Sequence, residues 1–241
     1  MCGRFAVTTD PARLAQEIDA VDETGGSAVV PNYNVAPTTE IATVVARDDR
    51  RCIWLMHWGL LPSWVKGDAG GRPITKSPLI NARAEKLSTS PAFRAAAAHQ
   101  RCLVPMDGYY EWIPDADNPK ARKTPFYMCR EDGAPLLVAG LWSVWKPDKA
   151  ADPLLSCTVV TTDAVGALAR VHDRMPLVLA EGDWGRWLDP DAPVPADLLA
   201  EPPDISGLAM REVSTLVNKV ANNGPELIAP ADHGNQPVGL F

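Results

Sequence analysis

Short apolar runs, separated by glycine, proline and aspartate, dominate the chain and predict β-strands. No long helical pattern alternates with these runs, so a parallel βαβ sheet is disfavoured. We predict one α+β domain over residues 2–241, built on a largely antiparallel, partly closed β-sheet with short peripheral helices. The predicted strands are 41–46, 52–60, 102–106, 109–113, 126–129, 136–142, 155–161 and 177–179.

A few segments carry helix or loop signals instead. Asp10 followed by Pro11 predicts a short helix over 10–17, with the aspartate as N-cap, and Ser90 with Pro91 repeats the device over 90–99. Two further short helices are expected near 184–188 and 196–200, followed by a polar terminal segment. The glycine-rich stretch 66–73 and the polar stretch 114–123 are expected to be long mobile loops.

The bulk composition allows a soluble globular protein with a substantial core. The chain has 241 residues, of which 46% are hydrophobic, and no run approaches the ~20 apolar residues of a membrane span. We therefore expect a cytoplasmic monomer with no membrane contact. The net charge of −7 gives no indication of nucleic-acid binding, but a groove lined by arginines can hold phosphates on an acidic protein.

Cys2 differs from the other cysteines of the chain. The five cysteines are odd in number, widely spaced and without a Cys-x-x-Cys pair, which argues against disulfides and against a zinc site. No cofactor and no metal is predicted. Four cysteines lie in apolar or strand-like segments and are expected to be buried free thiols: Cys52, Cys102, Cys129 and Cys157.

Removal of Met1 would leave Cys2 with a free α-amine and a thiol on adjacent carbons. The reference pKa values of these groups are about 8 and 8.5, so both are partly deprotonated near neutral pH. Such a pair suits aldehydes, because the amine forms an imine and the thiol closes it into a thiazolidine. Taken alone, a cysteine at this position is better explained by chance.

Two ionisable residues lie where proton transfer is an option. Glu111 lies between Tyr110 and Trp112 at the end of a predicted strand, where aromatic surroundings would raise its pKa toward the acid–base range. By simple alternation, however, Glu111 would face water, and periodicity does not choose between the two. His172 lies in a turn before a predicted strand, and histidine exchanges protons near neutral pH, although a surface or capping role is commoner.

Other polar and aromatic residues are candidates for binding an anionic strand. If 79–85 is a strand, Asn81, Arg83 and Glu85 share one face, which is either solvated or lines a polar cleft where Arg83 grips a phosphate. Arg4 and Arg174 are further cationic candidates. Most of the eight tryptophans are expected in the core, but Trp64 lies in a loop, where an indole can stack on a base.

Taken together, several motifs make the chain resemble the SOS response-associated peptidase family, also described as abasic site processing proteins. Each motif alone is weak, but their order from residue 2 onward is specific and covers nearly the whole chain. The matching segments are MCGRF (1–5), PNYNVAPT (31–38), WGLLPSW (58–64), NARAE (81–85), RCLVP (101–105), GYYEW (108–112), TT (161–162), HDRMP (172–176) and NNGPELI (222–228).

The resemblance implies a DNA-damage protein that senses abasic sites in single-stranded DNA and links to them covalently. By that likeness Cys2 is the nucleophile, giving a Schiff base and then a thiazolidine, with reversal and autocatalytic removal of Met1 as further activities. Asn81 corresponds to the residue that orients the Cys2 amine, and Glu111 to the carboxylate that shuttles protons. His172 corresponds to the histidine that assists at the sugar and the neighbouring phosphate.

The same likeness implies the residues that hold the DNA. They are Arg4, Asn34, Trp64, Arg83, Thr161, Arg174 and Met175. Two departures concern flanking contacts. Thr162 is followed by Asp-Ala-Val, without the asparagine expected after the alanine, and the loop after Trp64 is less compact than the family pattern.

Two alternatives from other classes stay open. One is an N-terminal-nucleophile cysteine hydrolase, acting as a peptidase or amidotransferase, which also uses a terminal cysteine with nearby Asn and His. The other is a non-catalytic single-strand binding module, in which arginines and tryptophans supply electrostatics and stacking.

Overall fold

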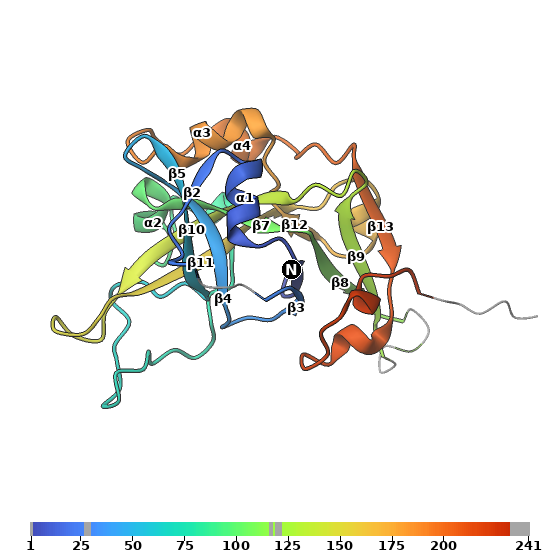
Figure 1. The fold of residues 1–241 in the computed structure, drawn as a ribbon, viewed down its shortest axis with the longest axis horizontal. Helices are drawn as coiled ribbons and strands as arrows, with labels where there is room; N and C mark the ends of the chain where they lie inside the picture. The colour runs from blue at the N-terminus through green and yellow to red at the C-terminus, as the bar shows by residue number, and fades with distance from the viewer. Residues whose placement is uncertain (1, 27–29, 116–117, 119–121, 232–241) are drawn as a thin grey trace, which may run out of the picture.

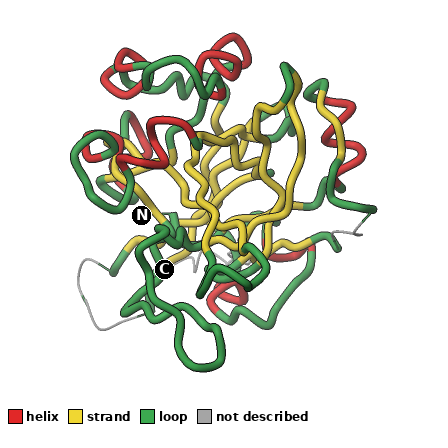
Figure 2. Tube along the Cα trace, turned by 90° about the vertical axis from the view of Figure 1, so that its left-hand side faces the viewer, coloured by secondary structure: helices red, strands yellow, loops and turns green. Residues whose placement is uncertain are grey.

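The structure is a computed structural model, and it describes all residues except 1, 27–29, 116–117, 119–121 and 232–241. Strands form two sheets in the centre of the molecule and short helices lie at its periphery (Figure 2). One sheet has the order β13-β9-β8-β1-β3, and the other has the order β12-β11-β10-β7-β4-β5-β2 with β6 paired to β11. The predicted α+β class with a largely antiparallel sheet is therefore confirmed.

The strands of the first sheet lie at both ends of the chain and in its middle. They are β1 (Phe5–Val7), β3 (Asn32–Val35), β8 (Gly108–Ile113), β9 (Thr124–Arg130) and β13 (Leu208–Glu212). The strands of the second sheet are β2 (Ala20–Asp22), β4 (Glu40–Arg47), β5 (Arg50–Trp58), β6 (Asn81–Arg83), β7 (Arg101–Met106), β10 (Leu136–Trp145), β11 (Leu154–Asp163) and β12 (Arg174–Pro176).

Part of the second sheet closes on itself. Strands β11, β10, β7, β4 and β5 follow one another, and β5 returns to β11 through a parallel pairing of His57 with Ser156 and Trp58 with Cys157. The partly closed sheet that the sequence predicts is this ring, with parallel pairings of β2 with β5 and of β6 with β11 added to it. Alternation along the strands gives the ring two apolar faces.

The two faces of the ring carry separate clusters of buried side chains. One face, including Val44, Leu103 and Leu141, packs against the helices α1, α2 and α3. The other face, including Met56, Val104 and Val159, packs against Phe5 and Tyr109 of the first sheet. The second cluster also contains Cys2, so the N-terminal strand carries the second residue of the chain into the core between the sheets.

The helices are short, and the four α-helices were predicted, whereas the 3₁₀ helices were not. They are α1 (Pro11–Glu17), α2 (Arg94–His99), α3 (Trp184–Leu188), α4 (Ala196–Ala200) and the 3₁₀ helices η1 (Ala84–Lys86), η2 (Gly166–Arg170), η3 (Glu181–Asp183), η4 (Thr215–Asn218) and η5 (Pro225–Leu227). Asp10 caps α1 as expected, accepting a hydrogen bond from Arg13 N at 3.0 Å. The second helix begins at Arg94 rather than near Ser90. Residues 90–93 form a turn instead, in which the Ser90 carbonyl accepts a hydrogen bond from Phe93 N.

The structure corrects other local predictions. No strand covers 177–179; Val178 makes only an isolated bridge to Val138, and the strand is β12 just before it. The segment after α4 is not simply polar, because β13 pairs with β9 along its whole length. Half of the predicted loop 114–123, residues 116–117 and 119–121, lies outside the described residues.

The loop predicted over 66–73 projects from the body as an arm, and most of its residues are exposed, but its base is anchored. Gly67 and Pro73 form a bridge, and a Cβ on Gly67 would lie 2.6 Å from the Pro147 Cβ. Trp145 donates a hydrogen bond from Nε1 to the Val65 carbonyl at 2.8 Å. The arm therefore rests on the β10–β11 hairpin, and Figure 1 shows it in cyan at the lower left.

Candidate functional site

Cys2 is fully buried, although it is the second residue of the chain. Chain ends are usually poorly ordered unless they are tied down. Here β1 pairs on both sides, with β3 and with β8, which holds the preceding residues in place. Burial raises the pKa of the Cys2 thiol well above its ordinary value, and the charge of Glu111 raises it further. The resting thiol is therefore protonated at neutral pH.

Asn81 fixes the backbone of Cys2. Its Nδ2 donates a hydrogen bond to the Cys2 carbonyl oxygen at 2.8 Å. The parallel pairing of Asn81 with Val159 sets this position. The Asn81 Oδ1 is also buried, and no described residue donates a hydrogen bond to it. The Asn81 side chain thus holds residue 2 through its Nδ2 and leaves its Oδ1 available as an acceptor.

Glu111 faces the interior and not the solvent. Its side chain is 5% exposed, so the interpretation by simple alternation with Glu111 in water is wrong. Alternation along β8 places Tyr109 on the Cys2 side with Glu111, while Tyr110 and Trp112 join a different cluster. Burial raises the pKa of Tyr109, and the charges of Cys2 and Glu111 add to the shift. A thiol, a carboxylate and a phenol therefore share one buried region.

His172 lies in the turn between the 3₁₀ helix η2 and the strand β12. Its Nδ1 lies 2.9 Å from the Arg174 backbone N and 2.6 Å from Asp173 Oδ1. Without a proton, Nδ1 accepts from Arg174 N; with a proton, it donates to the Asp173 carboxylate. About a third of the side chain is exposed. The Nδ1 atom therefore has two alternative partners, an acceptor and a donor, within hydrogen-bond distance.

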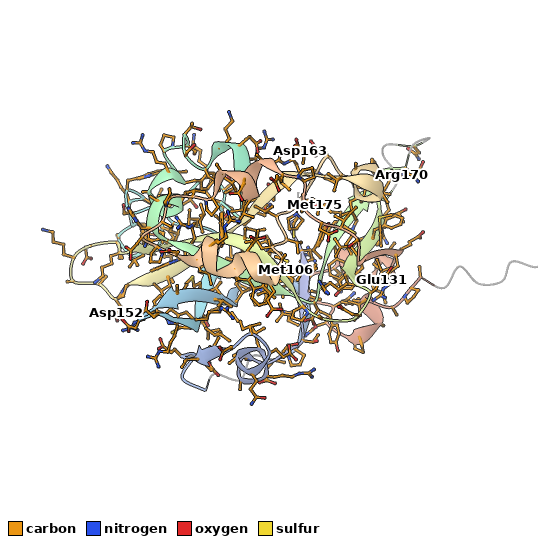
Figure 3. All side chains as sticks on the ribbon, turned by 90° about the horizontal axis from the view of Figure 1, so that it is seen from above. Met106, Glu131, Asp152, Asp163, Arg170 and Met175 are labelled. Atoms are coloured by element: carbon orange, nitrogen blue, oxygen red, sulfur yellow. The ribbon has the colours of Figure 1, made fainter. Side chains whose placement is uncertain are left out.

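Arg174 lies at the centre of an ion-pair cluster. Nη1 lies 2.5 Å from Asp163 Oδ1, while Nη2 lies 2.9 Å from Glu85 Oε2 and donates to the Thr161 carbonyl at 2.7 Å. The arginine side chain is 8% exposed, whereas that of Asp163 is 87% exposed. Figure 3 shows Asp163 at the periphery, with Met175 inward of it.

Thr161 and Met175 are both buried beside this cluster. Thr161 is fully buried and pairs with Pro176 across the β11–β12 ladder. Met175 is 1% exposed and belongs to the same apolar cluster as Cys2. In this structure both side chains line the interior.

Arg4 and Asn34 meet at the C-terminal part of the chain. Arg4 Nη1 donates to Asn34 Oδ1 at 2.7 Å and to the Val217 carbonyl at 3.1 Å. Asn34 Nδ2 contacts three carbonyl oxygens, those of Val217, Lys219 and Asn222, at 2.9–3.3 Å. The Asn34 amide is thus a tie between β3 and the segment after β13.

Trp64 and Arg83 are the exposed members of the predicted set. Trp64 is 64% exposed in the segment that leads from Leu60 into the arm, and its neighbour Val65 is buried. Arg83 ends β6, two residues after Asn81, and is exposed. Asn81 and Arg83 lie in one strand, as predicted, but the strand ends at Arg83. Glu85 lies in the 3₁₀ helix η1 and forms an ion pair with Arg174.

Sequence reasoning did not identify Asp163 and Asn222 as parts of this region. Asp163 pairs with the candidate Arg174, and its only sequence signal is that it follows the threonine pair. Asn222 accepts from Asn34 through its backbone carbonyl and donates from Nδ2 to Leu216 O at 2.8 Å. It lies in the matched motif of residues 222–228, which was used only for its coverage.

The arrangement suits nucleophilic chemistry assisted by proton transfer. A thiol, an orienting amide and a buried carboxylate come from three separate segments, and the exposed Arg83 follows Asn81 by two residues on the same strand. Within the described residues, no three His, Cys, Asp or Glu side chains are grouped as a metal would need, and no helix is both long and apolar enough to cross a membrane.

The comparisons with known proteins agree with one another. The family model described as "SOS response associated peptidase (SRAP)" matches residues 1–220. The abasic site processing protein YoqW of Bacillus subtilis is 34% identical over 95% of this chain and 99% of its own length. The abasic site processing protein YedK of Escherichia coli is 32% identical over 95% of this chain and all of its own length.

A more distant relative and two solved structures extend the likeness. The abasic site processing protein HMCES of Gallus gallus is 29% identical, covering 97% of this chain and 79% of its own length. A crystal structure of a protein from Bordetella bronchiseptica has a TM-score of 0.71 at 27% identity, over 88% of this chain and all of that one. One from Bacteroides thetaiotaomicron has a TM-score of 0.79 at 22% identity, over 95% of this chain and all of that one, and shares the fold.

Proposed function

The chain belongs to the SOS response associated peptidase family, and from this membership we propose that it recognises abasic sites in single-stranded DNA and links to them covalently through Cys2. Relatives named abasic site processing proteins match nearly the whole chain. The observation that carries the proposal is the burial of residue 2, which is held by Asn81 and lies within the electrostatic reach of Glu111.

The proposed chemistry begins with removal of Met1, which frees the Cys2 α-amine. The C1′ aldehyde of the ring-opened deoxyribose reacts with this amine and loses one water to give a Schiff base. Glu111 supplies the proton that lets the water leave and takes it up again on reversal. Asn81 orients the residue through its bond to the Cys2 carbonyl.

The thiol then completes the adduct. Its sulfur adds to the imine carbon while its proton moves to the nitrogen, so the thiazolidine is an isomer of the Schiff base. A persisting imine would acidify the neighbouring position and permit β-elimination of the 3′ phosphate. Ring closure removes the imine, so a thiol that stays protonated in the resting protein suits this order of steps.

The proposed DNA contacts come from the rim of the site. Trp64 stacks beside the lesion, Arg83 pairs with a phosphate, and His172 with Arg174 holds the adjoining backbone. Arg4 assists from the opposite side, while Asn34, Thr161 and Met175 shape the floor beneath. The protein acts as a monomer where DNA is exposed, in the cytoplasm and nucleoid.

The test is covalent adduct formation on matched oligonucleotides. Incubation with a single-stranded oligonucleotide containing one abasic site should give a denaturation-resistant adduct, and the intact oligonucleotide should give none. An N-terminal-nucleophile hydrolase would form no DNA-sized adduct with either, and a binding module would bind both equally. Either result would overturn the proposal.

A further inference from the structure

A groove far from Cys2 has no part in the chemistry proposed above. It has a volume of about 520 Å³ and opens on the interior face of the ring, at the end where Trp54 and Trp142 lie. Its lining includes Glu23, Thr24, Val144 and Leu155. Four residues further along β5, Trp58 packs on Phe5 near the Cys2 region. At about 3.3 Å per residue, Trp54 in the groove lies roughly 13 Å from Trp58 along the strand.

Two indoles and a carboxylate form the corner of this groove. The rings of Trp54 and Trp142 lie 5.5 Å apart at 85° to each other. Trp54 Nε1 donates to Glu23 Oε2 at 2.8 Å, and this hydrogen bond is the main reason that the pKa of Glu23 is lowered. The carboxylate is therefore ionised at the Nε1 edge of Trp54, in the groove that both indoles line. Aromatic faces with a nearby anion attract organic cations.

The chain itself shows which group this corner attracts. The guanidinium of Arg47 lies 5.9 Å from the centre of the Trp54 ring and 3.5 Å from Glu23 Oε2. That ion pair is long, and the Arg47 side chain is 56% exposed, so another guanidinium can replace it. Arg47 also lies 3.5 Å from Asp48 Oδ2, which gives it a second carboxylate partner.

The remaining lining suits a peptide rather than a free cation. Val144 is 37% exposed, and Leu155 continues the apolar surface beyond the tryptophans. Such a surface accommodates apolar side chains next to the cation. A phosphate backbone is disfavoured because it would meet the ionised Glu23.

We propose that the Trp54–Trp142 groove is a docking site for an extended peptide segment of a partner protein, with an arginine side chain over the two indoles and against Glu23. Apolar neighbours of that arginine pack on Val144 and Leu155. Because the groove lies away from Cys2, a docked partner leaves the DNA-linking site free. The groove thus provides recruitment without inhibition.

The test follows the eight tryptophan indole N–H signals of the full chain by nuclear magnetic resonance. The probe is a seven-residue peptide with one arginine flanked by leucine and proline, and its control carries citrulline, which keeps the shape and removes the charge. Trp54→Phe and Trp142→Phe assign the two signals. We expect these two to shift with the arginine peptide and the citrulline peptide to bind about tenfold more weakly.

Glu23→Gln should weaken the arginine peptide by a similar factor, since the amide still accepts from Trp54 but carries no charge. The matched control Glu201→Gln, on an exposed carboxylate outside the groove, should bind the peptide normally. Neither variant should change cross-linking to abasic DNA. Absence of shifts at millimolar peptide, equal binding of both peptides, or shifts of these two signals by undamaged single-stranded DNA instead would overturn the proposal, whatever the outcome at Cys2.

Discussion

The centre of the site and its rim hold their polar groups in different ways. At the centre, Cys2 and Glu111 are buried, and the sheets on both sides keep them in place. At the rim, Arg174 is bound by the solvent-exposed Asp163 and Arg83 is itself exposed. We therefore propose that the centre sets the chemistry and its rate, whereas exchangeable ion pairs at the rim set the affinity for the strand.

The strongest test of that division is Cys2→Ala. The variant keeps the α-amine and loses the thiol, so it should give an imine that borohydride traps but no stable adduct. Gel electrophoresis under denaturing conditions, with and without borohydride, measures both. Cys129→Ala is the matched control, because that buried thiol belongs to a different cluster. A stable adduct from Cys2→Ala would contradict the role of the centre.

Glu111→Gln should slow adduct formation by about 10²- to 10⁴-fold at saturating DNA, as expected for the loss of a general acid–base group. The amide fits the same buried space, so affinity for the oligonucleotide should stay close to normal. Single-turnover rates and equilibrium binding separate the two effects. Glu201→Gln serves as the control, and a normal rate for Glu111→Gln would remove the carboxylate from the mechanism.

Asn34→Ala distinguishes an anchor from a DNA contact. The side chain binds three carbonyls and Arg4, so its loss should lower the free energy of unfolding by about 2–3 kcal/mol. Urea unfolding measures this, and the rate at saturating DNA should be unchanged. Unaltered stability together with weaker DNA binding would instead assign Asn34 to the DNA surface.

The buried thiols predict a loss of stability in alkaline solution. Burial raises the pKa values of Cys2, Cys102 and Cys157 in the folded protein, whereas an unfolded thiol titrates near about 8.5. Above that pH the unfolded chain releases protons that the folded chain keeps, so stability falls as pH rises, by up to about 1.4 kcal/mol per pH unit for each thiol.

Urea unfolding at pH 7, 9 and 10 measures how the free energy of unfolding changes with pH. Cys2→Ala should reduce this slope by the contribution of one buried thiol. The full stabilisation is present below about pH 8.5. An equal slope in the variant would show that Cys2 titrates normally in the folded protein, which would contradict its burial.

The smallest expected effect belongs to the rim. Asp163→Asn removes one carboxylate from Arg174 and leaves Glu85 in place. Affinity for single-stranded DNA should rise about threefold at low salt, and the salt slope should steepen by about 0.7, the value for one additional phosphate contact. Asp152→Asn, on the exposed loop between β10 and β11, is the control (Figure 3). Unchanged affinity would mean that Arg174 does not meet the strand.

The sequence predicted the strands well where apolar runs were continuous, as in β4, β7 and β10, because burial on both faces leaves a strong local signal. It missed β13, whose residues are all half-buried, and it placed a strand at 177–179, three residues after the observed β12 at 174–176. The start of α2 was predicted too early, because the Ser90 carbonyl accepts the hydrogen bond of a turn and Ser90 does not cap the helix.

For the site, the local pattern could not place Glu111. Alternation along β8 is the same whichever face meets the core, and only the packing of β1 beside β8 decides that Glu111 shares the Cys2 side. The tie of Asn34 to Asn222 spans most of the chain and leaves no local signal. The resemblance to a family identified the candidate residues, but their burial and partners required the fold.

The most direct test of the central claim is intact mass spectrometry before and after mixing with a single-stranded oligonucleotide that carries one abasic site. We expect a chain without Met1 that gains the mass of the oligonucleotide minus one water. The adduct should resist borohydride without gaining two hydrogens, because a thiazolidine has no imine to reduce. A chain that retains Met1, or an adduct that borohydride reduces completely, would contradict covalent capture by Cys2.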